Sequence, residues 1–327
     1  MITHKGLTKE NQDVDCTDQR AVVAGGTQGI GAGVALRFAL AGADVWIIGR
    51  GEQKAHGVLD QLRLASAEAH RRRGVQNGSS DHQFFQADLR RVEDIERVAS
   101  DIKRRAGNRG IDYLVETQGG PPNGSIEPPA SSRSPEPSFA VQVASRFGLA
   151  YLLTADKTIK KGICMVAAPA SGGSKPLDTD DLDFLKAKEK GKAWTGYLGI
   201  PGQGQRESSV LDSVCQTLAE RNPDLVVAHL FPGLIATNAP ANRGFAWPFV
   251  QAYKVAGWLG IAASPMPGGY AEVPFYLMAG KGGAAYLRRG EANLLGAGLR
   301  RWDLSSNVRD PAVRDKVWTK MSSYFRT

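Results

Sequence analysis

The chain has 327 residues, with 41 Lys or Arg against 33 Asp or Glu, so its formal charge is +8. At roughly 100–200 residues per domain, this length accommodates one large domain or two. Hydrophobic residues make up 42% of the chain and charged residues 23%, which is ordinary for a globular protein and excludes a wholly disordered one. The positive excess is spread in short clusters, so a solvated surface explains it better than a nucleic-acid partner.

The cysteines and the apolar runs bear on the compartment. Three cysteines are present: Cys16, Cys164 and Cys215. They are too few and too scattered for a disulfide framework or a zinc site, so we expect a reducing compartment and a cytoplasmic protein. The polar leader, residues 1–18, has no apolar core of signal-peptide length. The longest apolar run, 245–263, contains Pro248 and Lys254, which favours a buried or lid-forming segment over stable membrane insertion.

Short apolar runs typical of strands alternate with helical patterns along the chain. The strands are expected at 21–24, 44–48, 83–86, 112–115, 163–167, 225–230 and, on a weaker pattern, 284–287. Several are apolar on both faces, as strands inside a parallel sheet are. Because the alternation implies right-handed crossovers, we predict the α/β class: a Rossmann-type doubly wound parallel sheet in a single domain with a lid insertion.

Three helices are marked by apolar residues that recur on one face. Two span residues 29–42 and 92–105, and a third begins after Asp310, which can cap it with Pro311 at its first position. The apolar positions are Ile30, Val34 and Phe38 in the first, Ile95, Val98 and Ile102 in the second, and Val313, Val317 and Met321 in the third.

Several stretches interrupt the pattern, and all of them follow strand ends. A loop rich in Pro, Gly and Ser covers 119–138, a polar insertion covers 171–196, and a lid covers 238–269. The carboxyl edge of an open α/β sheet is where ligands bind. We therefore predict one domain over 19–290, including the insertion and the lid, followed by a C-terminal extension with a helix over 291–327.

The strongest motif is AVVAGGTQGIGAGVALRF, residues 21–38, in which a strand runs into a glycine turn and a helix follows. The glycines permit the turn, the approach of a pyrophosphate and close helix packing, while the helix N-terminus offers N–H groups to phosphates. This context predicts a dinucleotide site, for which the alternative is a merely structural turn. The residues expected there are Gly25, Thr27, Gln28, Gly29, Ile30 and Gly31.

The end of the second strand indicates which dinucleotide binds. It ends in Gly49–Arg50, where an NAD site would present an acidic residue to the ribose hydroxyls. An arginine suits a 2′-phosphate, so we predict NADP(H) as the cofactor. The alternative is that Arg50 is simply an exposed residue at a strand end.

The glycine spacing resembles that of the short-chain dehydrogenase/reductase superfamily, and the likeness extends from about residue 20 to about residue 290. The resemblance implies a Rossmann-fold protein that binds NADP(H). It places Asp88 and Leu89 at the adenine ring and the segment 117–120, with Gln118 and Gly119, at the family's Asn-Asn-Ala-Gly stretch. Gln142 falls on a helix position that usually carries Asn. The stretch Pro232, Gly233 to Thr237 matches Pro-Gly-x3-Thr, whose Thr contacts the nicotinamide carboxamide. Other features are similar to a divergent branch common in fungi.

The resemblance breaks down at the catalytic centre. Members of the superfamily use a Tyr as general acid, a Lys four residues later and a Ser after the fifth strand. The cation lowers the pKa of the phenol, which is about 10 when unperturbed. This chain has no Tyr-x3-Lys between residues 170 and 225. The family's Tyr and Lys positions fall near Gly204 and Ser208, and 167–168 is Ala-Ala where the Ser would be.

Other residues near these positions could replace the missing catalytic Tyr, Lys and Ser. We predict Tyr197 as the proton donor and Ser171 as the partner of the carbonyl oxygen, with Arg206 or Lys192 as the positive charge. Each has a plain alternative: Tyr197 caps an insertion, Ser171 belongs to a turn, and the two cations are solvated. His229 is interpreted as a hydrogen-bonded core residue, and no His, Cys, Asp or Glu cluster has metal-ligand spacing.

Two functions compete at this stage. The first is an NADP(H)-dependent oxidoreductase, of carbonyl reductase or alcohol dehydrogenase type, acting on a small, fairly apolar molecule in secondary metabolism. Trp247, Tyr253 and Trp258 of the lid would form a substrate wall. The second is a superfamily scaffold without redox activity: an NADP(H)-binding sensor, a partner subunit or a non-oxidative catalyst. Expected partners are a small-molecule substrate and, from the resemblance, a second copy in a homodimer or homotetramer; neither nucleic acid nor a membrane is expected.

Overall fold

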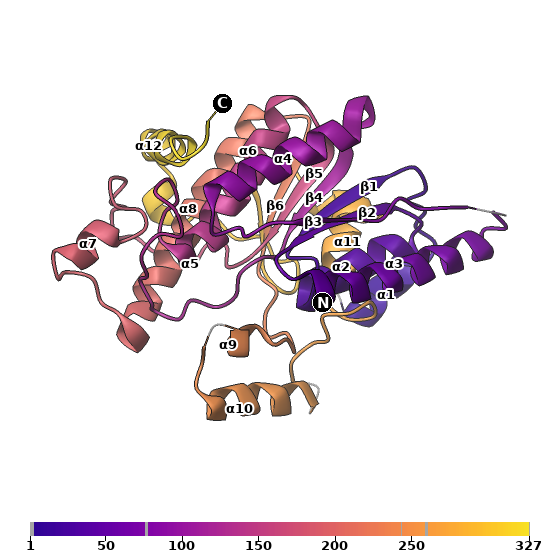
Figure 1. Ribbon diagram of the computed structural model, residues 1–327, viewed down its shortest axis with the longest axis horizontal. Coiled ribbons are helices and arrows are strands. Elements are labelled where there is room, and N and C mark those ends of the chain that lie inside the picture. Colours follow the sequence, from indigo (N-terminus) through magenta and orange to yellow (C-terminus); the bar gives the residue numbers. More distant parts are fainter. Residues whose placement is uncertain (1–2, 76–77, 243, 259–260, 327) are drawn as a thin grey trace.

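A computed structural model describes residues 3–75, 78–242, 244–258 and 261–326. Within them lies a seven-stranded, all-parallel sheet of order β3-β2-β1-β4-β5-β6-β7 (Figure 1). Its strands are β1 (Arg20–Ala24), β2 (Asp44–Gly49), β3 (Gln83–Gln86), β4 (Ile111–Glu116), β5 (Ile159–Val166), β6 (Val226–Leu230) and β7 (Asn293–Leu295). The strand order reverses between β1 and β4, which makes this point the switch point of a doubly wound sheet.

Helices cover both faces of the sheet (Figure 1). One face packs against α4 (Val92–Ala106), α6 (Ser145–Ala155) and α8 (Ile200–Arg221), with α12 (Pro311–Ser322) beyond them. The other packs against α2 (Gly29–Leu40), α3 (Glu52–Arg72) and α11 (Glu272–Ala279), with α1 (His4–Asn11) outside. Shorter helices are α5 (Pro137–Phe139), α7 (Leu185–Glu189), α9 (Ala239–Asn242) and α10 (Trp247–Trp258).

The two-sided apolar strands explain the layered packing. In β1, Val22 and Ala24 face the core on the α4 side, whereas Ala21 and Val23 face the core on the α2 side. All four are fully buried, as central parallel strands require. The predicted α/β class and the doubly wound parallel sheet are confirmed.

The seventh predicted strand was wrong. Gly283–Tyr286 form a 3-10 helix, and the edge strand is Asn293–Leu295. A Gly-Ala-Ala-Tyr segment has few β-branched residues to favour a strand. Asn293, in contrast, is locked by side-chain bonds to Val227 O at 3.0 Å and to Arg288 O at 2.8 Å. The sheet therefore extends past residue 290, into the segment expected to be only a C-terminal extension.

The polar leader is folded onto the domain. In α1, Asn11 Nδ2 donates to Glu272 O at 3.0 Å and to Glu272 Oε2 at 2.7 Å. Arg37 Nε of α2 donates to the same Oε2 at 3.0 Å. This buried network ties the leader to α2 and α11.

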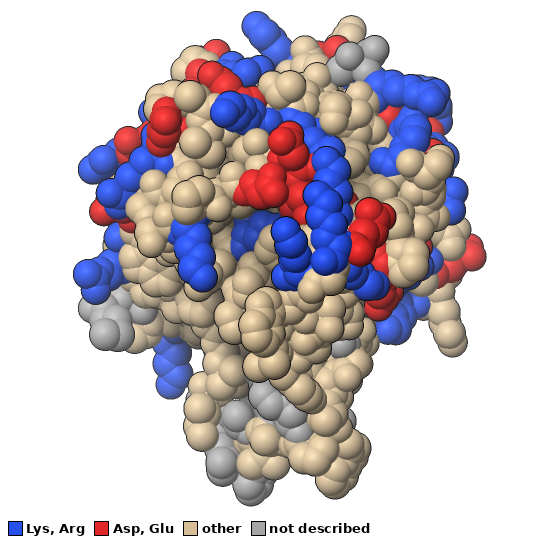
Figure 2. Space-filling view, turned by 90° about the vertical axis from the view of Figure 1, so that its left-hand side faces the viewer, with Lys and Arg blue, Asp and Glu red and all other residues tan. Residues whose placement is uncertain are grey.

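The lid stands out from the body of the molecule. It carries α9 and α10, and its stem is closed by a parallel bridge between Ile235 and Ala263. Figure 2 shows this projection below the charged body as a surface without Lys, Arg, Asp or Glu among the described side chains. Among the described residues, no helix has the length and apolar character needed to cross a membrane.

Candidate active site

A cavity of about 1360 Å³ opens at the carboxyl edge of the sheet, around the switch point. It is lined by residues of the glycine turn, of the loops after β2, β3, β4, β5 and β6, of α8 and of the lid. Of the residues predicted to bind cofactor, the cavity brings together Gly25, Thr27, Gln28, Gly29, Ile30, Arg50, Asp88, Leu89, Gln118, Gly119, Pro232, Gly233 and Thr237.

Gly31 lies behind this lining and has a packing role. A Cβ there would come within 2.3 Å of Gly25 O and 2.4 Å of Thr117 Oγ1, so only glycine lets α2 approach the ends of β1 and β4. Gly25 has φ +77°, a left-handed conformation that favours glycine. The turn thus has the shape that a dinucleotide cradle requires.

The N-terminus of α2 is open towards a ligand. Its N-cap residue, Gln28, is extended and makes no side-chain capping bond. Instead, Gln28 Oε1 accepts from Lys54 Nζ at 3.0 Å. The N–H groups of the first turn and the positive end of the helix dipole therefore fit a pyrophosphate.

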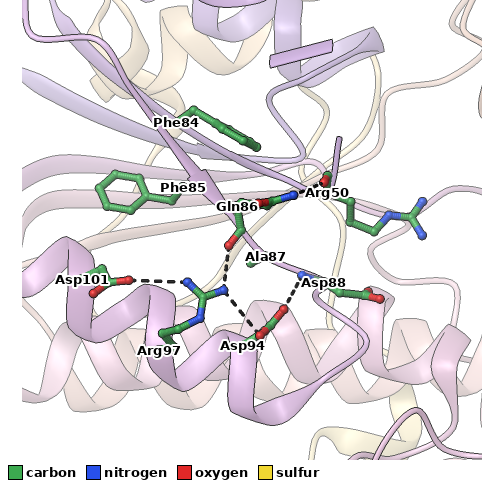
Figure 3. Close-up of a pocket in the computed structure, with 9 residues that line it drawn as sticks. All are labelled: Arg50, Phe84, Phe85, Gln86, Ala87, Asp88, Asp94, Arg97 and Asp101. Carbon is green, nitrogen blue, oxygen red and sulfur yellow. Dashed lines mark hydrogen bonds and ion pairs between the residues drawn. The ribbon is translucent and has the colours of Figure 1, made fainter. Parts of the chain in front are cut away.

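Arg50 and the outer edge of the cofactor region are drawn in Figure 3. Arg97, the other cation drawn there, is held by contacts within the protein. Its Nη2 donates to Gln86 O at 2.7 Å, and its guanidinium forms ion pairs with Asp94 at 3.4 Å and Asp101 at 3.5 Å. The guanidinium of Arg50 points away from this group (Figure 3) and forms no ion pair within the described part of the chain. It is an exposed cation beside the cavity and matches the need of a 2′-phosphate.

Asp88 is held by Arg90. Arg90 Nε lies 3.0 Å from both Asp88 oxygens, and its Nη2 lies 2.6 Å from Oδ2. Burial alone would raise the pKa of Asp88, but the bonds from Arg90 hold this pKa below its ordinary value. Asp88 is therefore an ionised acceptor at the end of the cavity where the resemblance places the adenine.

The family's catalytic positions on α8 face the cavity. Gly204, Glu207, Ser208 and Leu211 line it with helical spacing. Gly204 has no side chain to offer, and Ser208 Oγ accepts the N–H of Ser171 at 2.9 Å. The wall after β5 is apolar, since 166–168 is Val-Ala-Ala.

The four residues predicted as catalytic substitutes lie outside this lining. Tyr197 is 73% exposed on the 3-10 turn Gly196–Gly199, and Lys192 is exposed on the insertion. Ser171 is exposed too, and its hydroxyl donates to Pro169 O at 3.2 Å. Arg206 is buried under the insertion, 4.1 Å over the ring of Phe184.

A backbone contact explains the position of Tyr197. Gly196 N donates to Gly124 O at 3.0 Å, and Gln203 Oε1 accepts the N–H of Gly124 at 2.8 Å. A Cβ on Gly124 would come within 1.8 Å of Gly196 O. These glycines bring the insertion against the loop after β4 and leave the tyrosine on the outer side.

Arg146, a buried cation that was not among the predicted site residues, lines the cavity. Its Nη2 donates to Gln118 O at 2.6 Å and Val166 O at 3.0 Å, and its Nη1 donates to Gln142 O. Gln142 lies in a π-helical turn, Ala140–Ala144, a feature frequent at functional sites. Burial lowers the pKa of Arg146 to about 10 against the attraction of Glu116 and Glu207, so the group stays charged at neutral pH. Its four-residue spacing from Gln142 was the available signal.

Glu207 was also missed. It is 5% exposed, and its Oε1 accepts from Ser138 Oγ at 3.3 Å and lies 3.5 Å from Arg206 Nη2. In the sequence it is one half of an Arg-Glu pair that looks solvated. Its place three residues after Gly204, on the catalytic face of α8, was the signal that could have identified it.

His229 and the three cysteines are buried away from the cavity lining. His229 is fully buried with Nδ1 3.0 Å from Asp212 Oδ1, which confirms its interpretation as a hydrogen-bonded core residue. The three cysteines are free and buried. Within the described ranges, no group of three or more His, Cys, Asp or Glu could hold a metal ion.

Together, a doubly wound parallel sheet, a glycine turn and a cavity at the switch point define a Rossmann-type α/β protein. The sequence model of the short chain dehydrogenase family matches residues 19–163. Over these residues, which carry the glycine turn and β1 to β4, the chain matches the short-chain dehydrogenase/reductase superfamily.

Known proteins extend the likeness over most of the chain. The NmrA-like family domain-containing oxidoreductase notO of Aspergillus sp. (strain MF297-2) is 26% identical over 313 residues, which are 91% of this chain and 86% of that protein. A short chain dehydrogenase of Burkholderia cenocepacia J2315, solved in complex with NADP, superposes with a TM-score of 0.57 at 17% identity, covering 87% of this chain and 98% of that one. A dehydrogenase/reductase of Sinorhizobium meliloti 1021 gives 0.58 at 19% identity, covering 89% and 99%. These two structures show the shared fold.

Proposed function

We propose that the protein is an NADP(H)-dependent oxidoreductase that interconverts a carbonyl group and an alcohol on a small, fairly apolar molecule. One observation carries the proposal: all of the predicted cofactor residues except Gly31 line one cavity, with the exposed cation Arg50 at its edge. The related fold of the Burkholderia protein, solved with NADP, supports the same cofactor class. Its setting in secondary metabolism, cytoplasmic location and oligomeric state rest on the sequence alone.

Each end of the cavity has a part in holding the cofactor. The glycine turn and the N-terminus of α2 would hold the pyrophosphate, and Arg50 would hold the 2′-phosphate. Asp88 would accept from the adenine, and Thr237 would contact the nicotinamide end. When bound, the cofactor supplies or accepts a hydride at the substrate carbon.

The substrate end is largely apolar. Val166, Ala167, Leu211 and Phe231 line it, and Phe245 closes it from the lid. The described side chains of the lid beyond it show no Lys, Arg, Asp or Glu on the face seen in Figure 2. Trp247 of the predicted aromatic wall is 73% exposed, whereas the side chains of Tyr253 and Trp258 lie outside the described part. An apolar pocket with few polar groups suits a small apolar substrate.

A second function has a specific observation behind it. Glycine and serine occupy the Tyr and Lys positions on the cavity face of α8, and alanines occupy the Ser position. The protein would then bind NADP(H) without transferring hydride, as a sensor, a partner subunit or a non-oxidative catalyst.

Two measurements separate these functions. NADPH fluorescence titration reports binding, and NADPH absorbance with a panel of aromatic and aliphatic aldehydes and ketones reports turnover. Saturable binding with NADPH consumption on at least one carbonyl compound is the expected result. Binding with no consumption across the panel would favour the second function. No saturable binding would overturn both.

A further inference from the structure

We infer that Glu207 is the proton donor and acceptor of this active site, and that Arg146, a buried cation of the same cavity lining, adds a positive charge that acts on it, in place of the missing tyrosine and lysine. The inference rests on the proposed oxidoreductase function. It assigns the acid–base step to two residues of the cavity wall.

Position is the first argument for Glu207. It lies three residues after Gly204, so both face the cavity from α8. Gly204 presents no side chain to the cavity, and a Cβ there would meet Pro122 Cγ at 3.4 Å. Glu207 is the acid that lines the cavity from the same face of α8. The opposite wall, 166–168, offers only apolar side chains.

Three other carboxylates line the cavity, and each has different surroundings from Glu207. Asp88 is bonded to Arg90 at the adenine end. Glu136 accepts the N–H groups of Phe139 at 2.9 Å and of Glu127 at 3.3 Å. Glu127 is exposed at the surface. Of the two buried glutamates in the lining, Glu207 is the one on the face of α8 that carries the family's catalytic positions.

The surroundings of Glu207 suit proton exchange. Ser138 Oγ lies 3.3 Å from its Oε1, and Arg206 Nη2 lies 3.5 Å from the same oxygen. These contacts fix the carboxyl group against α5 and orient it. A buried carboxyl held in this way can pass a proton to a substrate oxygen within hydrogen-bond reach.

Hydrogen bonds to backbone carbonyl groups hold the Arg146 side chain in place. It donates to carbonyls of the loops after β4 and β5 and of the π-helical turn, and these are three segments that surround the substrate end. The carboxylates of Glu116 and Glu207 both act on its charge. A cation prepositioned in this way stabilises the carboxylate that forms when Glu207 gives up its proton. Arg146 thus acts through Glu207, as a positioning residue.

The step balances in both directions. In reduction, the Glu207 carboxyl gives its proton to the substrate oxygen as the C=O π bond opens and the carbon takes a hydride from reduced nicotinamide dinucleotide. The products are the alcohol, the oxidised dinucleotide and the Glu207 carboxylate, which regains a proton from solvent. In oxidation, the carboxylate takes the hydroxyl proton.

Cofactor affinities test the position of Glu207 without any substrate. The oxidised nicotinamide ring carries a positive charge that the reduced ring lacks, so a nearby carboxylate favours NADP+ over NADPH. At mildly alkaline pH, Glu207→Gln should lower the affinity for NADP+ relative to NADPH by about three- to tenfold. Glu207→Asp should keep most of the preference. Glu189→Gln, the same charge change on the exposed insertion, should leave it unchanged.

Turnover supplies the second readout once the carbonyl panel provides a probe. Glu207→Gln should lower kcat by about 10²-fold or more with NADPH still bound, and Glu207→Asp should recover part of it. Arg146→Lys should retain more activity than Arg146→Met when both remain folded by circular dichroism.

Two outcomes would overturn the inference, and they differ. If wild type binds neither cofactor, the proposed function fails and the inference fails with it. If wild type binds both and Glu207→Gln leaves their affinity ratio unchanged, the inference alone fails.

Discussion

His229 Nδ1 lies 3.0 Å from Asp212 Oδ1, and both side chains are fully buried. The same Asp212 carboxylate accepts the backbone N–H of Ala170 at 3.0 Å and of Ser305 at 3.2 Å, and the Ser305 hydroxyl at 2.7 Å. One carboxylate therefore joins α8, β6, the loop after β5 and the C-terminal segment. Ala170 is held at φ +57°, a strained conformation that persists only where neighbouring contacts enforce it.

Replacing Asp212 should destabilise the fold. Asp212→Asn removes the charge and presents an N–H₂ group to donors that need an acceptor, so we expect a loss of about 2–4 kcal/mol in the free energy of unfolding. The neighbouring Ser213 is buried, and its hydroxyl has no hydrogen-bond partner among the described residues. Ser213→Ala is therefore the control, with a change under about 1 kcal/mol. Equal urea midpoints for the two variants would contradict this account.

The sheet was predictable because its strands are apolar on both faces. Runs such as 21–24 and 44–48 allow few alternatives when helical patterns lie between them. The edge strand Asn293–Leu295 escaped notice because three residues carry too little periodicity. It is held by the side chain of Asn293 and by its place beside β6, and both are tertiary effects.

The residues expected to bind the cofactor could be predicted from the sequence, whereas Glu207 and Arg146 at the other end of the cavity could not. Glycines at a strand–helix junction have a backbone reason that is visible in the sequence. Glu207 and Arg146 lie on α8 and α6, and the ends of β4 and β5 bring them to one cavity. In the sequence, each is one more charged residue in a helix. Tyr197 stood out only as the tyrosine nearest to the expected position.

Reversing the charge of Arg50 tests the choice of cofactor. Arg50→Glu removes a cation and adds an anion beside the expected 2′-phosphate, so NADPH affinity should fall by about 10- to 100-fold. NADH affinity should change much less, because NADH lacks that phosphate. Fluorescence titration measures both, with Arg63→Glu on the exposed face of α3 as the charge-matched control. Equal losses for NADPH and NADH would refute the role of Arg50.

Replacing Tyr197 should have little effect on kcat if Glu207, and not Tyr197, is the proton donor. If the exposed phenol takes no part, Tyr197→Phe should leave kcat and NADPH affinity within about twofold of wild type. Ser171→Ala should behave likewise, because its hydroxyl bonds only to Pro169 O among the described residues. A collapse of kcat in Tyr197→Phe with normal NADPH affinity would restore the tyrosine as the proton donor.

Two helical glycines should respond to alanine in opposite ways. A Cβ on Gly33 of α2 would come within 2.0 Å of Pro265 O, in the segment that leads from the lid back to α11. Gly33→Ala should therefore destabilise the fold by about 1–3 kcal/mol. Gly57 of α3 has nothing within 4 Å of such an atom, so Gly57→Ala should stabilise it by about 0.5–1 kcal/mol. Urea unfolding of both variants measures the contrast, and shifts of the same sign would contradict it.

The buried Glu116 should make stability depend on pH. No donor among the described residues is in good hydrogen-bond geometry with either of its carboxylate oxygens, although the Gln118 side chain is close enough to lower the pKa somewhat. Burial raises its pKa well above the ordinary 4.5, although Arg146 attracts the carboxylate. Between 4.5 and the raised value, the native state binds more protons than the unfolded state. The free energy of unfolding contributed by this group is therefore full below 4.5 and is lost as the pH rises.

Glu116→Gln removes this titration while keeping the shape of the side chain. Its free energy of unfolding, measured by urea at several pH values, should equal that of wild type in acid and exceed it increasingly towards alkaline pH. Glu189→Gln, on the exposed insertion, should run parallel to wild type throughout. A constant difference between Glu116→Gln and wild type would show that Glu116 does not change its protonation on unfolding. Arg146 would then stabilise the Glu116 carboxylate in the folded state. Because Glu116 would compensate its positive charge, Arg146 could stabilise the Glu207 carboxylate only weakly.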